Sequence, residues 1–168
     1  MPATESKRFT GVRVVVATAT HFDEVLDKLA GLLGNAPFEQ LGALVRASSN
    51  REAFEREVER RFVGESGFMK FGEIDHGSWL GMYGIHRRSV RWIFGNPLIA
   101  VTMIRHDMSA GLFVPLEMLI TEAEDGVGAT LTYLLPSSLM VIEDNQPLRA
   151  AAEALDKKVA ALVERVAY

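Results

Sequence analysis

Four polar side chains in the middle of the chain carry the groups that general acid–base chemistry uses. They are His76, Arg91, His106 and Glu117. Histidine titrates near neutral pH, a carboxylate can accept a proton, and a guanidinium can hold a carboxylate or phosphate through its planar set of N–H donors. One interpretation is therefore an enzyme whose polar site is formed by these four residues. No serine-nucleophile or phosphate-loop motif accompanies them.

Metal binding is a second alternative, because the chain has four histidines, at positions 21, 76, 86 and 106. A helical metal site needs two histidines four residues apart, and none of these four has that spacing. The neighbours Asp75-His76 and His106-Asp107 point away from each other on most backbones. We therefore predict no metal ligands and no cofactor, and expect histidines at the surface or at helix ends.

Arg91 and Glu117 lie in two segments whose residues alternate between apolar and polar. Arg91 alternates with Trp92, and Glu117 alternates with Leu116 and Met118. Alternation at this period places the charged pair on the face of a sheet opposite the apolar side chains. We predict a cross-strand ion pair, with an anion site at Arg91 as the alternative.

The turn Gly95-Asn96-Pro97 joins a predicted strand to a predicted short helix. Proline presets the helical φ at the first position, and an asparagine before it is a good N-cap. The exposed N–H groups at such a helix start can also hold an anion. Asn96 is thus predicted to cap the helix over residues 97–104, with a ligand contact as the alternative.

Large apolar side chains are concentrated between residues 68 and 140. Methionine and aromatic residues suit an adaptable pocket or a dimer surface, although they equally suit an ordinary core. Our leading hypothesis is a non-enzymatic module that forms a homodimer and binds a small apolar or amphipathic ligand between sheet and helix. The residues predicted to contact the ligand are His76, Trp79, Tyr83, Arg91, Asn96, His106, Glu117 and Tyr133.

The composition disfavours several classes of binding partner and indicates the cellular compartment. The net charge of −4 disfavours nucleic acid, which attracts basic surfaces, and no segment is apolar over the length that membrane insertion requires. With no cysteine in the chain, disulfides and thiolate chemistry are excluded. We expect a soluble, cytoplasmic protein.

The order of the predicted elements indicates the fold class. Residues 1–10 are expected to form a flexible tail, followed by a single domain over residues 11–168. A strand at 12–17 and a helix at 22–33 precede an extra helical segment at 37–62. Strands follow at 68–74, 88–94, 114–121 and 128–134, and a long helix begins at Pro147. This order predicts an α+β fold, with a mostly antiparallel sheet and the first and last helices packed on one face.

Three stretches resemble a known family. They are Trp92-Ile93-Phe94-Gly95-Asn96-Pro97-Leu98, the segment Gly111-Leu112-Phe113-Val114-Pro115-Leu116-Glu117, and Pro136-Ser137-Ser138 after Tyr133. They are similar to the domain-of-unknown-function 302 family, and His76-Gly77-Ser78-Trp79-Leu80 resembles its longer branch. The resemblance implies a strand-helix-four-strand-helix arrangement similar to the TATA-box-binding-protein-like class. It implies no activity and no catalytic residues, because function depends on sites and not on folds.

Overall fold

The computed structural model describes residues 4–168, so residues 1–3 of the predicted flexible tail lie outside the described part of the chain. Residues 4–10 form neither helix nor strand. Two contacts hold them to the body of the protein. Lys7 forms an ion pair with Glu143 at 2.5 Å, and the ring of Phe9 meets that of Phe113 edge-on, with 6.2 Å between centroids.

The centre of the fold is one antiparallel sheet. Its strands are β1 (Arg13–Thr18), β2 (Met69–Asp75), β3 (Ser89–Gly95), β4 (Leu116–Glu122) and β5 (Ala129–Leu134). Their spatial order is β1-β5-β4-β3-β2, and every neighbouring pair is antiparallel. This confirms the predicted α+β class. β4 begins two residues later than predicted because Pro115 has no N–H for the ladder.

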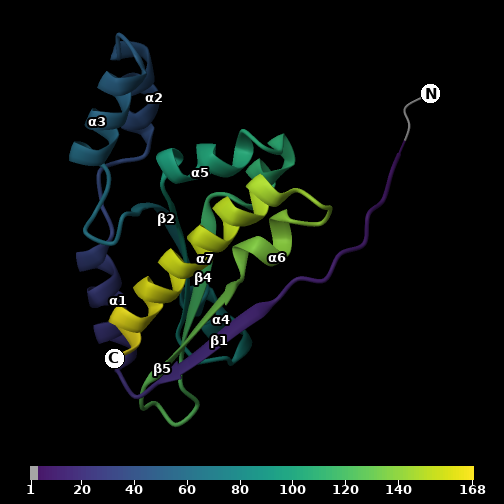
Figure 1. The fold of residues 1–168 in the computed structure, drawn as a ribbon. Helices are drawn as coiled ribbons and strands as arrows, with labels where there is room; N and C mark the ends of the chain where they lie inside the picture. The colour runs from purple at the N-terminus through teal and green to yellow at the C-terminus, as the bar shows by residue number, and fades with distance from the viewer. Residues whose placement is uncertain (1–3) are drawn as a thin grey trace.

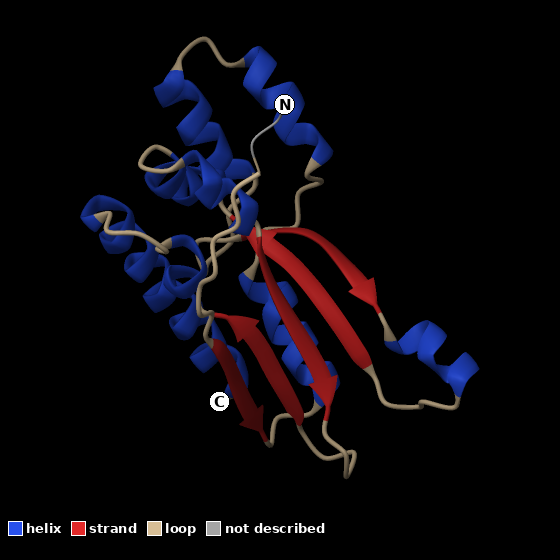
Figure 2. Ribbon diagram, turned by 90° about the vertical axis from the view of Figure 1, so that its right-hand side faces the viewer, coloured by secondary structure: helices blue, strands red, loops and turns tan. Residues whose placement is uncertain are grey.

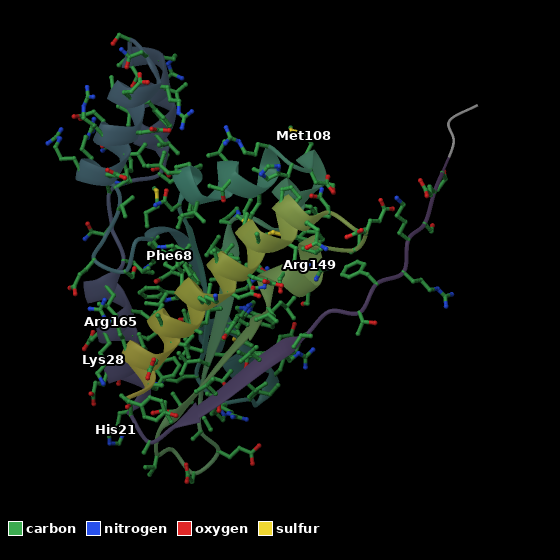
Figure 3. The ribbon with its side chains drawn as sticks, in the orientation of Figure 1. His21, Lys28, Phe68, Met108, Arg149 and Arg165 are labelled. Carbon is green, nitrogen blue, oxygen red and sulfur yellow. The ribbon has the colours of Figure 1, made fainter. Side chains whose placement is uncertain are left out.

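Two helices cover one face of this sheet (Figure 1). They are α1 (Phe22–Leu32) and α7 (Gln146–Ala167), as predicted from the apolar stripes of both segments. Their apolar residues and the inward residues of the strands form one buried cluster, which includes Val25, Leu155 and Met118. Figure 3 places Phe68 in this interior, beside α7.

The predicted segment 37–62 forms two helices, α2 (Glu39–Ala47) and α3 (Arg51–Arg61), which project as a hairpin beyond α5 (Figure 1). The hairpin has its own small cluster of Leu44, Val58, Phe62 and Met69. Its base is closed by Gly34 and Gly64, whose N–H groups both donate to the carbonyl of Phe68, at 3.0 and 2.9 Å. A Cβ on Gly34 would lie 1.7 Å from the carbonyl oxygen of Phe62, so only glycine allows the two chain segments to approach this closely.

Residues 4–168 also form five short helices, four of them between strands and one, α6, between β5 and α7. They are α4 (Gly77–Leu80), η1 (Gly81–Tyr83), α5 (Pro97–Ile104), η2 (Met108–Phe113) and α6 (Pro136–Met140). Only α5 was predicted as a helix. α4 lies away from α7, beyond the ends of β2 and β3 (Figure 2). In the part of the chain that the structure describes, none of the helices combines the length and apolarity needed to cross a bilayer.

Within residues 4–168, no helix packs across the centre of the sheet face opposite α1 and α7 (Figure 2). Strand alternation divides the side chains, so that Trp92 and Met118 are buried under the helices while Arg91 and Glu117 face outward. We call this second surface the open face. Its apolar members are Val15, Ala17, Ile74, Ile93, Leu119 and Leu134.

Candidate functional site

A trough of about 700 Å³ crosses the open face from β1 to the start of α4. Strands β5, β4 and β3 form its floor, and the end of η2 and α6 close one end. Its polar side chains are Arg13, His76, Arg91, Glu117 and Thr132. Its apolar side chains include Leu112, Leu119, Leu134 and Leu139. The trough is therefore amphipathic, with charged groups set among leucines.

Arg91 and Glu117 form an ion pair on the floor of the trough. Arg91 pairs in register with Leu119, and Glu117 pairs with Ile93, so the two charged residues are diagonal neighbours across β3 and β4. The cross-strand pair predicted from alternation is confirmed. Both side chains remain accessible, at 36% and 49% exposure, and each can still bind a second charged group.

The positive charges of the trough exceed its negative ones. The trough has two guanidinium groups, Arg13 at one end and Arg91 on the floor, and one carboxylate, that of Glu117. His76 lies at the other end, where its backbone N–H donates to the carbonyl of Ser89 at 2.9 Å. An anionic group entering the trough would meet two guanidinium groups, which are suited to bidentate contacts with carboxylates.

The predicted residues Trp79 and Tyr83 continue from His76 in an aromatic row along α4 and η1. The His76 and Trp79 rings lie 6.1 Å apart, and the Trp79 and Tyr83 rings lie 6.2 Å apart, both in edge-on geometry. Trp79 is 49% exposed and Tyr83 is 76% exposed. Accessible aromatic rings of this kind are enriched at protein interfaces.

Tyr133 borders the trough from β5, but its side chain is buried on the helical side of the sheet. It pairs in register with Met118, whose side chain is also buried. Burial raises the pKa of the Tyr133 hydroxyl, and the nearby carboxylate of Asp156 on α7 raises it further. The phenol is thus kept neutral.

Asn96 performs the predicted capping role at the start of α5. Its Oδ1 accepts from the N–H of Leu98 at 2.8 Å, and its Nδ2 donates to the carbonyl of Gly67 at 2.9 Å. The asparagine therefore ties α5 to the loop that precedes β2. It lies at a second, smaller cavity and not at the trough.

His106 lies apart from the other predicted polar residues. It follows the last turn of α5, and its carbonyl accepts a hydrogen bond from Nδ2 of Asn145 at 3.2 Å. It does not line the trough. The structure therefore brings together three members of the predicted enzyme site, His76, Arg91 and Glu117, without the fourth. Among residues 4–168 there is no group of three His, Asp or Glu side chains placed to hold a metal ion.

Several lining residues were absent from the sequence prediction. Arg13 alternates with Val14 and Val16, so the sequence indicates that its side chain points away from the apolar face. The sequence does not indicate that β1 pairs with β5, and this pairing brings Arg13 to the trough. Thr132 and Leu134 share the outward face of β5. Leu112 comes from η2, a segment without a clear periodic pattern.

Comparison with known proteins gives a family and a fold. The family model described as domain of unknown function DUF302 matches residues 45–166. The chain is similar to the crystal structure of an uncharacterized conserved DUF302 protein from Bacillus stearothermophilus, with a TM-score of 0.62 and 16% identity. The alignment covers 92% of this chain and 97% of that one. A search of curated proteins gives no match. At this identity the likeness shows the fold alone.

Proposed function

This chain belongs to the DUF302 family, a domain of unknown function, and on that premise we propose that it is a non-enzymatic module that self-associates through its open face. Two copies would pack sheet against sheet and hold a small amphipathic ligand in the trough between them. We place the module in the cytoplasm, in keeping with its lack of cysteine.

The observation that carries the proposal is the apolar character of the open face. Along each strand of an antiparallel sheet with one solvent-exposed face, apolar residues on the buried side normally alternate with polar residues on the exposed side. Here Val15, Leu134 and Ile74 point outward and are 58%, 48% and 40% exposed. A partner that covers these side chains removes them from water, which is the main favourable term in association.

The charges at the centre of the open face favour a second copy of the same chain as the partner. In a two-fold dimer both protomers use the same surface patch. When one residue of the first protomer contacts a second residue of its partner, the reciprocal contact also forms. β4 is the central strand of the sheet, and the pair of Arg91 and Glu117 lies across β4 and β3. A two-fold axis that lies between the facing sheets, over this pair and at right angles to the line joining its two charges, sets Arg91 of one protomer against Glu117 of its partner, giving four charges of alternating sign.

The size of the sheet suits such a contact. Five strands at a spacing of about 4.8 Å, each about 20 Å long, give a face of roughly 500 Å². Two faces together reach about 1,000 Å², the lower limit of specific interfaces, before α4 and η1 add their side chains. Trp79 and Tyr83 provide exposed aromatic area next to this face.

The ligand part of the proposal is supported by the mixed lining of the trough. Arg13 and Arg91 can receive an anionic head group, while Leu112 and Leu134 can cover an apolar tail. Ligand sites commonly combine such apolar walls with a few convergent polar groups. A second protomer placed over the trough would shield the ligand from water and strengthen its charged contacts.

Sedimentation equilibrium tests the self-association over protein concentrations from about 1 µM to about 1 mM. We expect a mass that rises to twice the 18.5 kDa of one chain. A mass that stays at 18.5 kDa throughout contradicts the proposal. Calorimetric titration with octanoate, an amphipathic anion, tests the ligand. We expect binding that weakens in Arg91→Met, and equal affinity in that variant contradicts an anion contact at Arg91.

A further inference from the structure

A second cavity adjoins the trough at Pro115 and Leu116, and lies between α5, the start of α2 and the edge of the sheet where β3 ends and β4 begins. Its volume is about 220 Å³. Phe38 and Leu41 close it from the side of α2, Phe71 from β2, and Ala100 and Met103 from α5. The trough and this cavity lie on different sides of the Val114–Leu116 segment, which touches both.

The lining of this cavity is almost entirely hydrocarbon. No Asp, Glu, Lys, Arg or His side chain lines the cavity, and Asn96 is the one lining side chain with a hydrogen-bonding group. That side chain is already engaged, accepting from Leu98 N–H and donating to the Gly67 carbonyl. A charged ligand entering here would lose its hydration without gaining a partner, so the cavity selects against charge.

The helix α5 carries more apolar surface than the fold covers. Every residue from Pro97 to Ile104 except Thr102 is apolar, yet Met103 alone is fully buried. A helix that is apolar on nearly all sides is normally buried on nearly all sides. Ile99 and Ala100 are half-buried and line the cavity. A molecule in the cavity would cover more of Ile99 and Ala100, although it would not reach Val101, which does not line the cavity.

Three aromatic rings and one thioether lie in the walls beside aliphatic side chains. The rings of Phe38 and Phe71 are 4.7 Å apart and tilted by 53°, and the ring of Phe68 also borders the space. Aromatic rings favour tilted and edge-on contacts with further rings, and the sulfur of Met103 adds another favourable contact. Phe38 is 44% exposed and forms the outer wall, from which a ligand can enter.

From these observations we propose that the cavity is a binding site for a small uncharged aromatic molecule of one or two fused rings. The size agrees with this class, because apolar cavities of about 150 Å³ in proteins accept benzene. The site adjoins the trough at Pro115 and Leu116, but binding there does not require self-association. Indole is a suitable probe, and benzoate is its charged counterpart.

The test follows the methionine methyl resonances by NMR while indole is added. We expect saturable shifts at Met103, which lines the cavity, and none at Met82, which is 87% exposed on η1. Benzoate should leave Met103 unchanged. Equal shifts of Met103 with both probes, or no saturable shift with indole, overturn the proposal.

Two substitutions on α5 locate the site. Ala100→Leu puts a larger side chain into the cavity, and we expect the affinity for indole to fall by at least about tenfold while the thermal unfolding temperature is unchanged or higher. Thr102→Leu adds an apolar side chain on the exposed side of the same helix and should bind indole like the wild type. Wild-type affinity in Ala100→Leu overturns the proposal.

If Ala100→Leu does not fold, a third variant tests the location of the indole site. Phe38→Ala removes the outer wall at a 44% exposed position just before α2, outside the sheet. Loss of one aromatic contact should weaken indole binding by roughly threefold to tenfold. Unchanged affinity in Phe38→Ala contradicts the assignment of the site.

Discussion

Arg91 and Glu117 form an ion pair at the centre of the open face, as diagonal neighbours on β3 and β4. Both ends of the pair remain accessible to a partner. Because an exposed pair contributes little to the stability of a single chain, its larger effect is expected in association. The proposed two-fold contact places each of these charges opposite its complement in the partner.

Charge reversal at this pair tests the two-fold geometry. Arg91→Glu and Glu117→Arg should each weaken the dimer by at least about tenfold, because each variant sets like charges against one another across the interface. The double variant restores opposite charges and should recover most of the affinity. Sedimentation velocity measures the dimer, and the unfolding free energy of each variant should change by less than about 1 kcal/mol. A double variant that associates no better than the singles argues against this geometry.

Asn96 is predicted to be a stability residue. Asn96→Ala removes the cap of α5 and the hydrogen bond to Gly67, and should lower the free energy of unfolding by about 2 kcal/mol. Asn96→Asp keeps an acceptor for the Leu98 N–H and loses the donor, so its loss should be smaller. Urea denaturation measures both. Equal losses in the two variants would show that the cap contributes nothing.

The fold class and the covered sheet face were predictable because they depend on local patterns. Alternation in residues 88–94 and 114–121 separates Trp92 and Met118 from Arg91 and Glu117, and the apolar stripes of α1 and α7 mark the faces that cover the sheet. Asn96 was predictable as a cap because Pro97 follows it.

The two cavities were not predictable because they join segments that are distant in sequence. The trough needs the pairing of β1 with β5, which brings Arg13 opposite Leu134. The apolar cavity needs Phe38 of the helical hairpin to lie against Phe71. Periodicity reveals which way a side chain points, but not which strand or helix lies beside it. The same limit explains why His106 was grouped with His76.

Two glycines three residues apart should respond to alanine in opposite directions. Gly34→Ala places a methyl group against the backbone of Phe62 and Gly64, and should lower the unfolding free energy by more than about 3 kcal/mol. Gly31 lies on the exposed side of α1 with no atom near its would-be Cβ, so Gly31→Ala should raise stability by about 0.5–1 kcal/mol. Chemical denaturation measures both variants. A mild effect at Gly34 would contradict the close approach of the two segments at the base of the hairpin.

The contact between Asp23 and Arg88 should make stability depend on pH in the acid range. The hydrogen bond from Arg88, 2.8 Å long, lowers the pKa of the Asp23 carboxyl below its ordinary value of 3.8. A lowered folded-state pKa stabilises the protein above the unfolded-state pKa, and the contribution disappears as pH falls through the folded-state pKa. Asp23→Asn should therefore unfold at a lower temperature than wild type at pH 7, and the difference should begin to shrink near pH 3.8 and vanish only below the lower pKa of the folded state. A difference that persists in strong acid would point to another cause.

The most direct test of the open face as the site of self-association compares two valines of similar exposure. Val15 lies on the open face of β1 and is 58% exposed, whereas Val101 lies on α5 and is 45% exposed. Sedimentation equilibrium of Val15→Glu and Val101→Glu, each checked for unchanged secondary structure, gives the dimer affinity. We expect Val15→Glu to remain at the mass of one chain where wild type and Val101→Glu are dimers. Wild-type affinity in Val15→Glu, or loss of the dimer in Val101→Glu alone, would contradict the proposed interface.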